Sequence, residues 1–267
     1  MSTNQRDPSV EALRFENVTL EFPGGHQPAI EDVSLRVARR KFVAVIGPSG
    51  CGKSTILNLA AGLLAPTQGE VHFDGEPVTG VNSHAAYVTQ KANLLPWLSV
   101  KANIGLALKF RNLPRDERTE RIAHWIKVVG LTGFEDHYPR ELSGGMQKRV
   151  AIARALIYDP SIVLMDEPFG PLDAITRLKL QQELLNLWEE QQGTLVFVTH
   201  DLNEAIYLAD EVVVMSSGPG RIRRVLQVPF ERPRNIGTLV ESREFSEIYN
   251  DLWSQFKSEI DVQAGRP

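Results

Sequence analysis

One glycine-rich segment of this chain has the residue types and spacing that bind phosphate groups. It reads Gly47-Pro48-Ser49-Gly50-Cys51-Gly52-Lys53-Ser54, followed by Thr55, and it matches the pattern G-x-x-x-x-G-K-[ST]. Glycines allow backbone N–H groups to surround an anion, and the positive end of a following helix adds attraction. Lys53 supplies a cation for the β- and γ-phosphates of a nucleotide, and the Ser54 hydroxyl suits Mg²⁺. The alternative, a glycine-rich turn that matches by chance, is disfavoured because an apolar run precedes the motif and a predicted helix follows it.

A pair of acidic residues follows a second apolar run. Ile162-Val163-Leu164-Met165 has the composition of a buried strand, and Asp166 and Glu167 come directly after it. Asp166 is suited to hold Mg²⁺, directly or through water, and Glu167 is suited to polarise an attacking water molecule. Adjacent carboxylates more often lie solvated on a surface, but here they share a chain with a phosphate loop.

A Ser-Gly-Gly turn within Leu142–Gln147 opens another predicted helix. Such a turn offers a second anion site formed by Ser143, Gly144 and Gly145. The plainer interpretation is that Ser143 only caps the helix. Two phosphate-binding helix starts in one chain suggest that two subunits contact one nucleotide.

The elements that must position these residues are the strands and helices of an α/β fold. Residues 13–46 indicate strands and turns, and Val33, Leu35 and Val37 alternate as on a strand with one buried face. Continuous apolar runs predict buried parallel strands, with helical segments between the later ones, at 42–46, 162–165, 195–198 and 212–215.

Two regions differ from this strand-rich core. Residues 93–157 show helical spacing and are predicted to form a helical insertion. A final amphipathic helix is predicted from apolar residues on one side, namely Phe245, Ile248, Tyr249, Leu252 and Phe256. We expect this stripe to cover the chain's own body, with a regulatory or subunit contact as the alternative.

Composition excludes several classes of protein. The chain has 267 residues, a formal charge of −4 and a pI near 5.9, which disfavours a strongly basic nucleic-acid binder. No run approaches the ~18 consecutive apolar residues of a membrane helix. The N-terminal segment lacks the apolar core of a secretory signal. One cysteine excludes an internal disulfide and a Cys-only zinc site. We therefore expect a soluble intracellular protein.

Residues 11–225 resemble the ATP-binding-cassette (ABC) family of ATPases, because that family's motifs occur in the family's order. They are Phe22 where an aromatic ring stacks on adenine, the Walker A at Gly47–Ser54, Gln90 in the Q-loop, the signature at Leu142–Met146, the Walker B at Ile162–Asp166, Glu167 as catalytic glutamate, Asp173 in the D-loop and His200 in the H-loop. The resemblance implies an α/β P-loop NTPase core with an N-terminal antiparallel β subdomain and a helical insertion. Residues 226–267 would then form a C-terminal extension.

The resemblance also implies roles for single residues. Glu167, His200 and Gln90 would be catalytic, with His200 contacting the γ-phosphate and orienting the water that Glu167 polarises. Ser54, Gln90 and Asp166 would bind Mg²⁺, and Gln90 would connect the site to the helical insertion. Read without the family, His200 is a core histidine, Gln90 a polar strand end and Phe22 an aromatic packed in a sheet.

The sequence departs from the family pattern at three positions. The signature has Met146 where the family usually has glutamine, and the D-loop has Gly170-Pro171 in place of Ser-Ala.

Cys51 is either a small residue tolerated in the loop or an unusually acidic thiol, because Lys53 and a helix start are close. In the second case, thiol reagents would inhibit and bound MgATP would protect.

The resemblance further implies a function. Leu94–Trp97, the Gly-Gly-Met-Gln signature and Gly218–Ile222 resemble the nitrate, sulfonate and taurine import branch, and thiamine-precursor importers look similar. The chain would hydrolyse ATP with Mg²⁺ at the cytoplasmic face of the membrane, as a homodimer bound to transmembrane permease subunits. A solute-binding protein would act indirectly, and nucleic acid would not be a partner. Trp97 either anchors the insertion or belongs to the surface that meets a membrane partner.

Two other functions compete with this one. A soluble ABC ATPase acting on nucleic acid or ribosomes is the first, but the segment between Gln90 and Ser143 lacks the sustained heptads of a long coiled coil. Ribosome-acting relatives also carry two cassettes in one chain, and this chain has one. A P-loop kinase or GTPase is the second, and the Ser-Gly-Gly turn argues against it.

Overall fold

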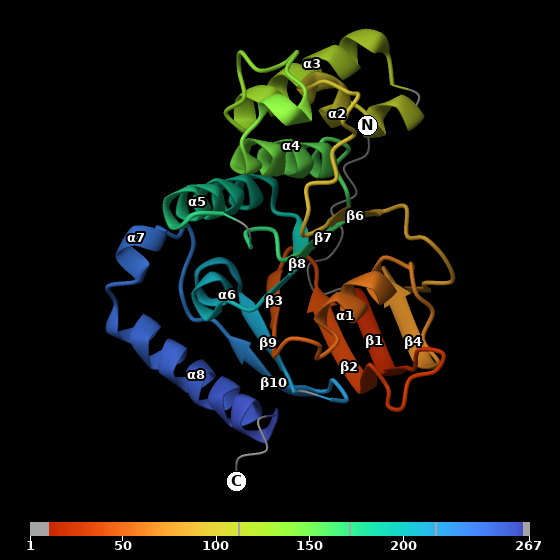
Figure 1. Cartoon of the computed structure of the whole chain (residues 1–267), viewed down its shortest axis with the longest axis vertical. Helices are drawn as coiled ribbons and strands as arrows, with labels where there is room; N and C mark the ends of the chain where they lie inside the picture. Colours follow the sequence, from red (N-terminus) through yellow and green to blue (C-terminus); the bar gives the residue numbers. More distant parts are fainter. Residues whose placement is uncertain (1–10, 112, 171, 217, 264–267) are drawn as a thin grey trace.

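The central feature of the fold is a six-stranded sheet. The computed structural model describes residues 11–263 except 112, 171 and 217. The strands follow the order β10-β9-β3-β8-β7-β6 (Figure 1). Their bounds are Phe42–Ile46 (β3), Ala85–Val88 (β6), Ile162–Asp166 (β7), Thr194–Thr199 (β8), Glu211–Met215 (β9) and Ile222–Gln227 (β10). All pairs are parallel except β9 with β10. The four apolar runs are therefore confirmed as strands.

A second sheet is antiparallel and comes from the N-terminal third of the chain. It has the order β2-β1-β4-β5, with β1 at Glu11–Leu20, β2 at Ile30–Ala38, β4 at Gln68–Phe73 and β5 at Glu76–Pro77. In β2, Val33, Leu35 and Val37 are buried and the residues between them are exposed. This sheet is the predicted antiparallel β subdomain.

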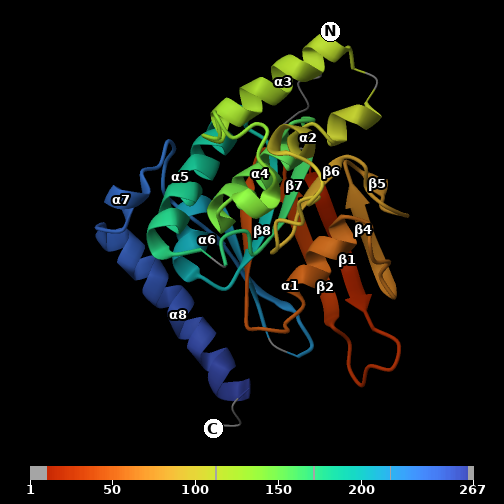
Figure 2. The ribbon, with the colours of Figure 1, turned by 45° about the horizontal axis from the view of Figure 1, so that its top comes forward.

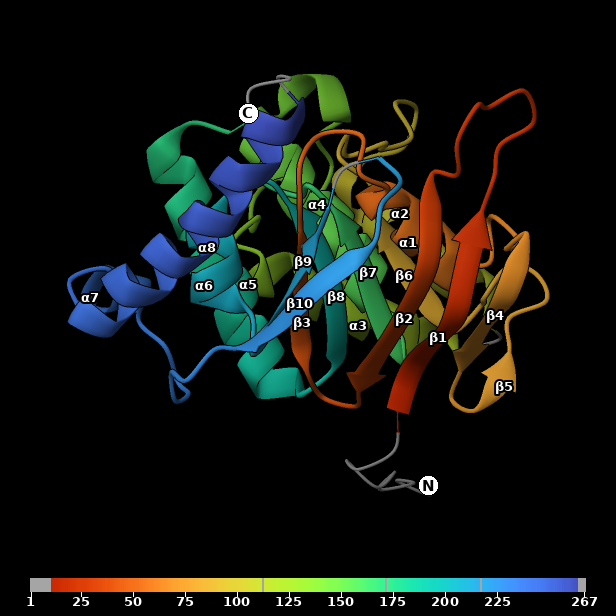
Figure 3. The same ribbon diagram turned by 90° about the horizontal axis from the view of Figure 1, so that it is seen from below.

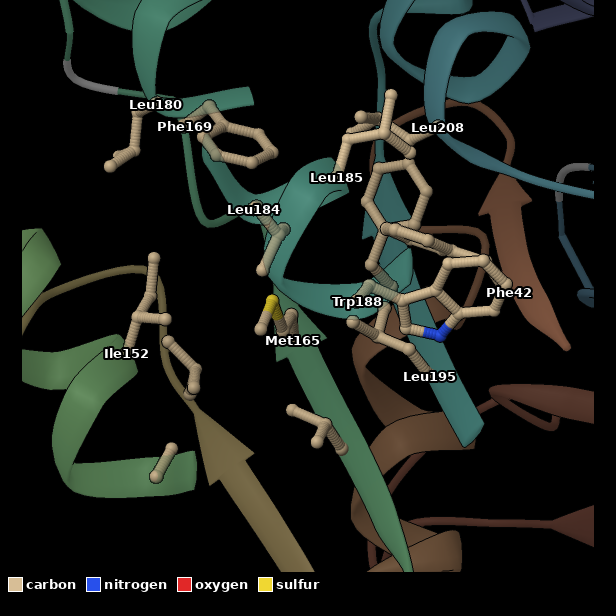
Figure 4. Packing of buried hydrophobic residues seen from close by; sticks show 14 of the residues in the cluster. Phe42, Ile152, Met165, Phe169, Leu180, Leu184, Leu185, Trp188, Leu195 and Leu208 are labelled. Atoms are coloured by element: carbon tan, nitrogen blue, oxygen red, sulfur yellow. The ribbon is translucent and has the colours of Figure 1, made fainter. Parts of the chain in front are cut away.

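The central sheet is buried on both faces, which explains its continuous apolar runs. On β3, Phe42, Ala44 and Ile46 enter one core cluster, whereas Val43 and Val45 enter the cluster shared with β1 and β2. The helix α1 (Lys53–Ala60) packs in the second cluster. The helices α5 (Ala174–Gln191) and α6 (Leu202–Leu208) belong to the first. Figure 4 shows Phe42 beside Trp188 of α5, with their ring centroids 5.5 Å apart.

The predicted insertion at 93–157 is helical. It contains α2 (Val100–Ile104), α3 (Arg115–Val128) and α4 (Gly144–Leu156), with short 3₁₀ turns at Ala107–Phe110 and Pro139–Glu141. Figures 1 and 2 both show α2, α3 and α4 grouped above the strand ends of the central sheet. After α4 the chain returns to the central sheet, and β7 begins a few residues later.

The C-terminal segment packs into the same core as the central sheet. It contains α7 (Ile236–Leu239) and α8 (Arg243–Gln263), and Figure 3 shows α8 lying over α6. Phe245 and Leu252 are buried in the first core cluster, and the Phe245 ring stacks on Tyr207 of α6 at 5.2 Å. The predicted amphipathic helix is confirmed, and its apolar side faces the chain's own body. Within the described part of the chain, no helix has both the length and the apolar character needed to cross a membrane.

Leu252→Ala should destabilise the whole protein, because this side chain is 0% exposed and lies in the common core. We expect the free energy of unfolding to fall by about 2–5 kcal/mol, as for other buried leucines. Urea unfolding measures it. Trp253→Ala is the matched control on the next residue, which is about half exposed, and it should cost clearly less. Equal losses would mean that α8 does not share the core.

Candidate nucleotide and hydrolysis site

The phosphate loop connects β3 to α1 with a backbone that requires glycine. Gly50 and Gly52 have φ of +79° and +93°, in the left-handed region that side chains disfavour. A Cβ added to Gly52 would lie 2.3 Å from a methyl group of Ile30, so the loop packs closely against the start of β2. Gly52 stands immediately before α1, and the free N–H groups of that helix start therefore face the loop.

Lys53 lies inside the curve of this loop. Its side chain is buried, and the Nζ donates hydrogen bonds to the carbonyl oxygens of Gly47 and Pro48 at 2.8 and 2.9 Å. Ser49 and Gly50, at the tip of the loop, are exposed. The loop thus holds a cation beneath an accessible rim of backbone, which is an arrangement suited to an anion.

The structure corrects the expectation that Cys51 presents a reactive thiol to a phosphate. The side chain is 1% exposed and belongs to the core cluster beneath α1. Its Sγ would lie 2.6 Å from a Cβ added to Gly47, so the sulfur faces the inner side of the loop. Burial of the sulfur favours the plainer interpretation of a small residue, and it removes the reason to expect inhibition by thiol reagents.

Ser54 and Asp166 place two oxygen donors together. The Ser54 hydroxyl donates to Asp166 Oδ1 at 3.0 Å across the sheet edge. Burial raises the pKa of the Asp166 carboxyl, and the Ser54 hydrogen bond and Lys53 act against that rise. A half-buried carboxylate beside a hydroxyl fits Mg²⁺, because this ion prefers oxygen ligands and relieves a partly desolvated negative charge.

Glu167 occupies a strained turn at the end of β7. Its φ is +42°, in the left-handed region, and its backbone N–H donates to the Val198 carbonyl of β8 at 3.0 Å. Such a conformation costs on the order of 1–3 kcal/mol in a non-glycine residue and concentrates at functional sites. The turn directs the carboxylate toward the ends of the two neighbouring strands.

Two further side chains contact the Glu167 carboxylate, one on each oxygen. Gln90, just after β6, donates from Nε2 to Oε2 at 3.1 Å. His200, just after β8, has its Nδ1 3.3 Å from Oε1. The structure therefore brings together the three residues predicted as catalytic, and it does so at the carboxyl ends of three adjacent strands. This arrangement suits activation of a water molecule by a carboxylate whose orientation is fixed.

The other predicted site residues lie away from this cluster. Ser143 caps α4 and accepts a hydrogen bond from the Met146 N–H at 3.3 Å, and Asp173 caps α5 and accepts from Thr176 at 3.0 Å. Ser143, Gly144 and Asp173 are exposed, whereas Gly145 is buried. Figures 1 and 2 both show α4 apart from α1. Ser143 therefore caps α4, and its exposure leaves it accessible to a second molecule. The D-loop residue Pro171 lies outside the described residues.

Phe22 lies in the loop between β1 and β2 and is 47% exposed. The base of this loop closes through the hydrogen bond from Ala29 N to the Leu20 carbonyl at 2.8 Å. Ala29 and Ile30 then approach Gly52 of the phosphate loop. The exposed ring therefore stands on a loop that is attached to the phosphate site, rather than packed in a sheet.

Sequence reasoning missed a buried carboxyl behind His200. Glu204 stands three residues after Asp201, the N-cap of α6, where a capping-box acid facing solvent would be expected. Instead it is 5% exposed, and it accepts hydrogen bonds from Thr199 and from Gln181 of α5. Burial raises the pKa of Glu204 to about 7, with Asp201 adding to the rise and Thr199, Arg177 and His200 opposing it. The network fixes both neighbours of His200, because Thr199 also accepts from the Asp201 N–H.

A buried lysine was missed as well. Lys148 of α4 is 2% exposed, and burial lowers its pKa to about 8. A lysine after a signature-like turn is ordinarily read as a solvated helix residue, so the sequence carried no signal of its burial.

Known proteins share much of this chain's sequence. Residues 30–170, more than half of the chain, match the family model described as ABC transporter. An uncharacterized ABC transporter ATP-binding protein of Methanocaldococcus jannaschii is 45% identical over 96% of this chain and 95% of its own length. The nitrate import ATP-binding protein NrtD of Synechococcus elongatus is 46% identical, covering 88% of each chain. The aliphatic sulfonates import ATP-binding protein SsuB of Bacillus cereus is 43% identical over 87% of this chain and 90% of its own.

Solved structures show the same fold. A dimeric ATP-binding cassette in a post-hydrolysis state with ADP and Pi is 35% identical, with a TM-score of 0.72, and the alignment covers 82% of this chain and all of the other. The cbiO1 protein of Clostridium perfringens, part of an ABC transporter complex, is 26% identical with a TM-score of 0.75, covering 82% and 89%.

Glu204→Gln should change the pH dependence of stability, because it replaces the buried carboxyl by a neutral amide of the same size. The pKa of Glu204 in the folded chain, about 7, lies above its ordinary 4.5. The stabilising contribution of the protonated carboxyl is therefore complete below about pH 4.5 and is lost as the pH rises through about 7. We expect the free energy of unfolding of the wild type, relative to the variant, to fall by up to ~3 kcal/mol between about pH 5 and pH 8.

Urea unfolding of both proteins at the two pH values measures this difference. Glu244→Gln, at an exposed position in the first turn of α8, is the control. Its free energy of unfolding should differ from that of the wild type by about the same amount at both pH values. A wild-type-to-Glu204→Gln difference that is the same at both pH values would contradict the raised pKa.

Proposed function

Because this chain belongs to the ABC transporter family, we propose that it is the ATP-hydrolysing subunit of a membrane importer for a small anion or organic solute. The chain is an ABC ATPase, and ATP is its nucleotide. The import function rests on similarity to nitrate and aliphatic sulfonate import proteins at 43–46% identity. Nitrate, a sulfonate or taurine is the proposed solute class.

The observation that carries the hydrolytic assignment is the arrangement around Glu167. The carboxylate is held on one oxygen by Gln90 and approached on the other by His200, close to the Ser54–Asp166 pair. In our proposal Glu167 accepts the proton of a water molecule whose oxygen attacks the γ-phosphorus. The bond from the γ-phosphorus to the bridging oxygen breaks, and ADP and phosphate leave.

Most of the rate enhancement in such a reaction comes from positioning and charge. Lys53 and the N–H groups of the phosphate loop would hold the phosphates, with Phe22 stacked on the adenine. Residues suited to hold Mg²⁺ are Ser54 and Asp166, with Gln90 nearby. When bound, the ion neutralises charge on the β- and γ-phosphates. His200 would keep the water in line, and the buried network of Thr199 and Glu204 behind it supports that position.

We further propose that two copies of the chain share each nucleotide. Ser143, Gly144 and Asp173 are exposed at helix starts, and N-terminal N–H groups favour a phosphate. With these residues facing the partner's phosphate loop, Gly145 beneath them supports the turn. A similar cassette has been solved as a dimer with ADP and Pi.

The remaining partners are proposed to be transmembrane permease subunits, which place the chain at the cytoplasmic face of the membrane, and indirectly a solute-binding protein. Residues 11–225 would form the ATPase unit and residues 226–267 an extension.

Trp97 is 69% exposed and Phe110 is 83% exposed, both in the helical insertion. That exposure favours the interpretation of Trp97 as part of a partner surface over that of a core anchor.

Reconstitution tests the import function. The chain is co-expressed with candidate permease and binding-protein genes, and the complex is placed in liposomes. Uptake of labelled nitrate or taurine that needs ATP on the side of this chain supports the proposal. A complex that exports the solute, or a chain that hydrolyses ATP but never associates with a permease, would contradict it.

Glu167→Gln should slow hydrolysis by about 100-fold or more, because the amide cannot accept the proton of water. ATP binding should persist, since the substitution removes a negative charge near the triphosphate. Steady-state ATPase and binding of a fluorescent ATP analogue measure the two effects. Asp166→Asn is the comparison. It should weaken nucleotide binding measured in the presence of Mg²⁺, because Asp166 is proposed to hold the ion. Turnover near that of the wild type would rule out Glu167 as the base.

Ser143→Arg should prevent ATP-dependent dimerisation, because it places bulk and charge where the partner's γ-phosphate would lie. The measurement is size-exclusion chromatography with and without ATP, on Glu167→Gln alone and combined with Ser143→Arg. Glu167→Gln with Ser246→Arg, an exposed position on α8, is the control and should still dimerise. A Ser143→Arg double variant that dimerises as well as the control would disprove the shared site.

A further inference from the structure

The loop that carries Gln90 is held by side chains rather than by backbone pairing. Each carbonyl of residues 89–93 accepts a hydrogen bond from a side chain. Lys148 donates to the carbonyls of Thr89, at 3.1 Å, and of Gln90. Arg154 donates to those of Ala92 and Asn93 at 3.0 and 3.1 Å. The remaining carbonyl, of Lys91, accepts from the Thr89 hydroxyl at 2.7 Å. Four of the five carbonyls are therefore bound by two cations.

Both cations belong to α4, the helix that Ser143 opens. Lys148 and Arg154 are six residues apart, and together they bridge the loop from one end to the other. Lys148 is 2% exposed, so its ammonium has little access to water and depends on these carbonyls and on the field of Asp166. Buried charges that lose such partners are strongly destabilised, so the loop and the helix are expected to keep this contact.

Gln90, which belongs to this loop, contacts the Glu167 carboxylate through its side chain. Gln90 Nε2 contacts Glu167 at 3.1 Å, while the carbonyl of Gln90 is bound by Lys148. One residue thus connects α4 to the base. A shift of α4 relative to the sheet would move the backbone of residues 89–93 and, with it, the contact between Gln90 and Glu167.

We propose that Lys148, with Arg154, is a positioning residue for hydrolysis, which sets the place of Gln90 at Glu167 by holding the carbonyls of its loop. Lys148 itself contacts neither the proposed nucleotide nor the Glu167 carboxylate. This inference rests on the proposed role of Glu167 as base. A displacement of about 1 Å at a reacting centre is enough to cost a large factor in rate, so a small change at the loop is sufficient.

Kinetic measurements distinguish a positioning role for Lys148 from a purely structural one. If Lys148 positions Gln90, Lys148→Gln should lower kcat about 10-fold or more with less than about a 3-fold change in the KM for ATP. Lys148→Arg retains the charge and the donors and should restore most of the activity. Arg149→Gln is the matched control on the next residue, because Arg149 pairs with Glu183 on the other side of α4 and should leave kcat unchanged.

A double-mutant cycle supplies the readout that a structural role would not move. Gln90→Ala removes the contact with Glu167, so adding Lys148→Gln to it should lower kcat no further. Additive losses would overturn the inference, as would a Lys148→Gln protein with wild-type kcat. Should Lys148→Gln fail to fold, Arg154→Gln tests the other end of the loop by the same cycle.

The ATPase of the full-length wild-type chain, measured alone and with its permease, separates this inference from the proposed function. Hydrolysis by the wild type with an unaffected Lys148→Gln variant overturns only the positioning role. Absence of hydrolysis by the wild type in both preparations overturns the proposed function and this inference with it.

Discussion

The site depends most on two contacts of the Glu167 carboxylate, the hydrogen bond from Gln90 and the 3.3 Å approach of the His200 ring. These three residues follow β7, β6 and β8, and they meet only because those strands are parallel neighbours whose carboxyl ends share one edge of the sheet. The left-handed backbone at Glu167 is retained because the sheet supports it, through the hydrogen bond to Val198. Burial of the sheet on both faces keeps that edge in register.

Around this edge, buried polar groups provide rigidity that an apolar core cannot. Glu204 fixes the residues on either side of His200, and Lys148 fixes the backbone that carries Gln90. Each group has a desolvation cost, seen in the raised pKa of Glu204 and the lowered pKa of Lys148. Hydrogen bonds offset that cost only in one arrangement, so these residues specify the geometry of the site more than they stabilise the fold.

The starts of α1 and α4 differ in how closely they are packed. At α1 the phosphate loop is closely packed, with Gly52 against Ile30 and Lys53 turned onto its own carbonyls. At α4, Ser143 and Gly144 are exposed and carry only a cap. In the proposed dimer, one half of each nucleotide site is preformed within the chain, and the exposed start of α4 supplies the other half to the partner. The helical insertion that carries α4 is also the part bound to the Gln90 loop.

The sequence by itself determined the strands, the helical insertion and the types of chemistry, because apolar periodicity and short motifs are local properties. The phosphate loop, the Asp166-Glu167 pair and the final amphipathic helix were all predictable in this way. Only the tertiary structure decided which side chains meet. Gln90 and Glu167 are 77 residues apart, and Lys148 lies 58 residues from the carbonyl it binds. It also decided between the two interpretations of Cys51, which faces the core, and it buried Glu204, where the local pattern favoured a solvated capping residue. Burial and contact depend on packing between distant segments, and no spacing within one segment records them.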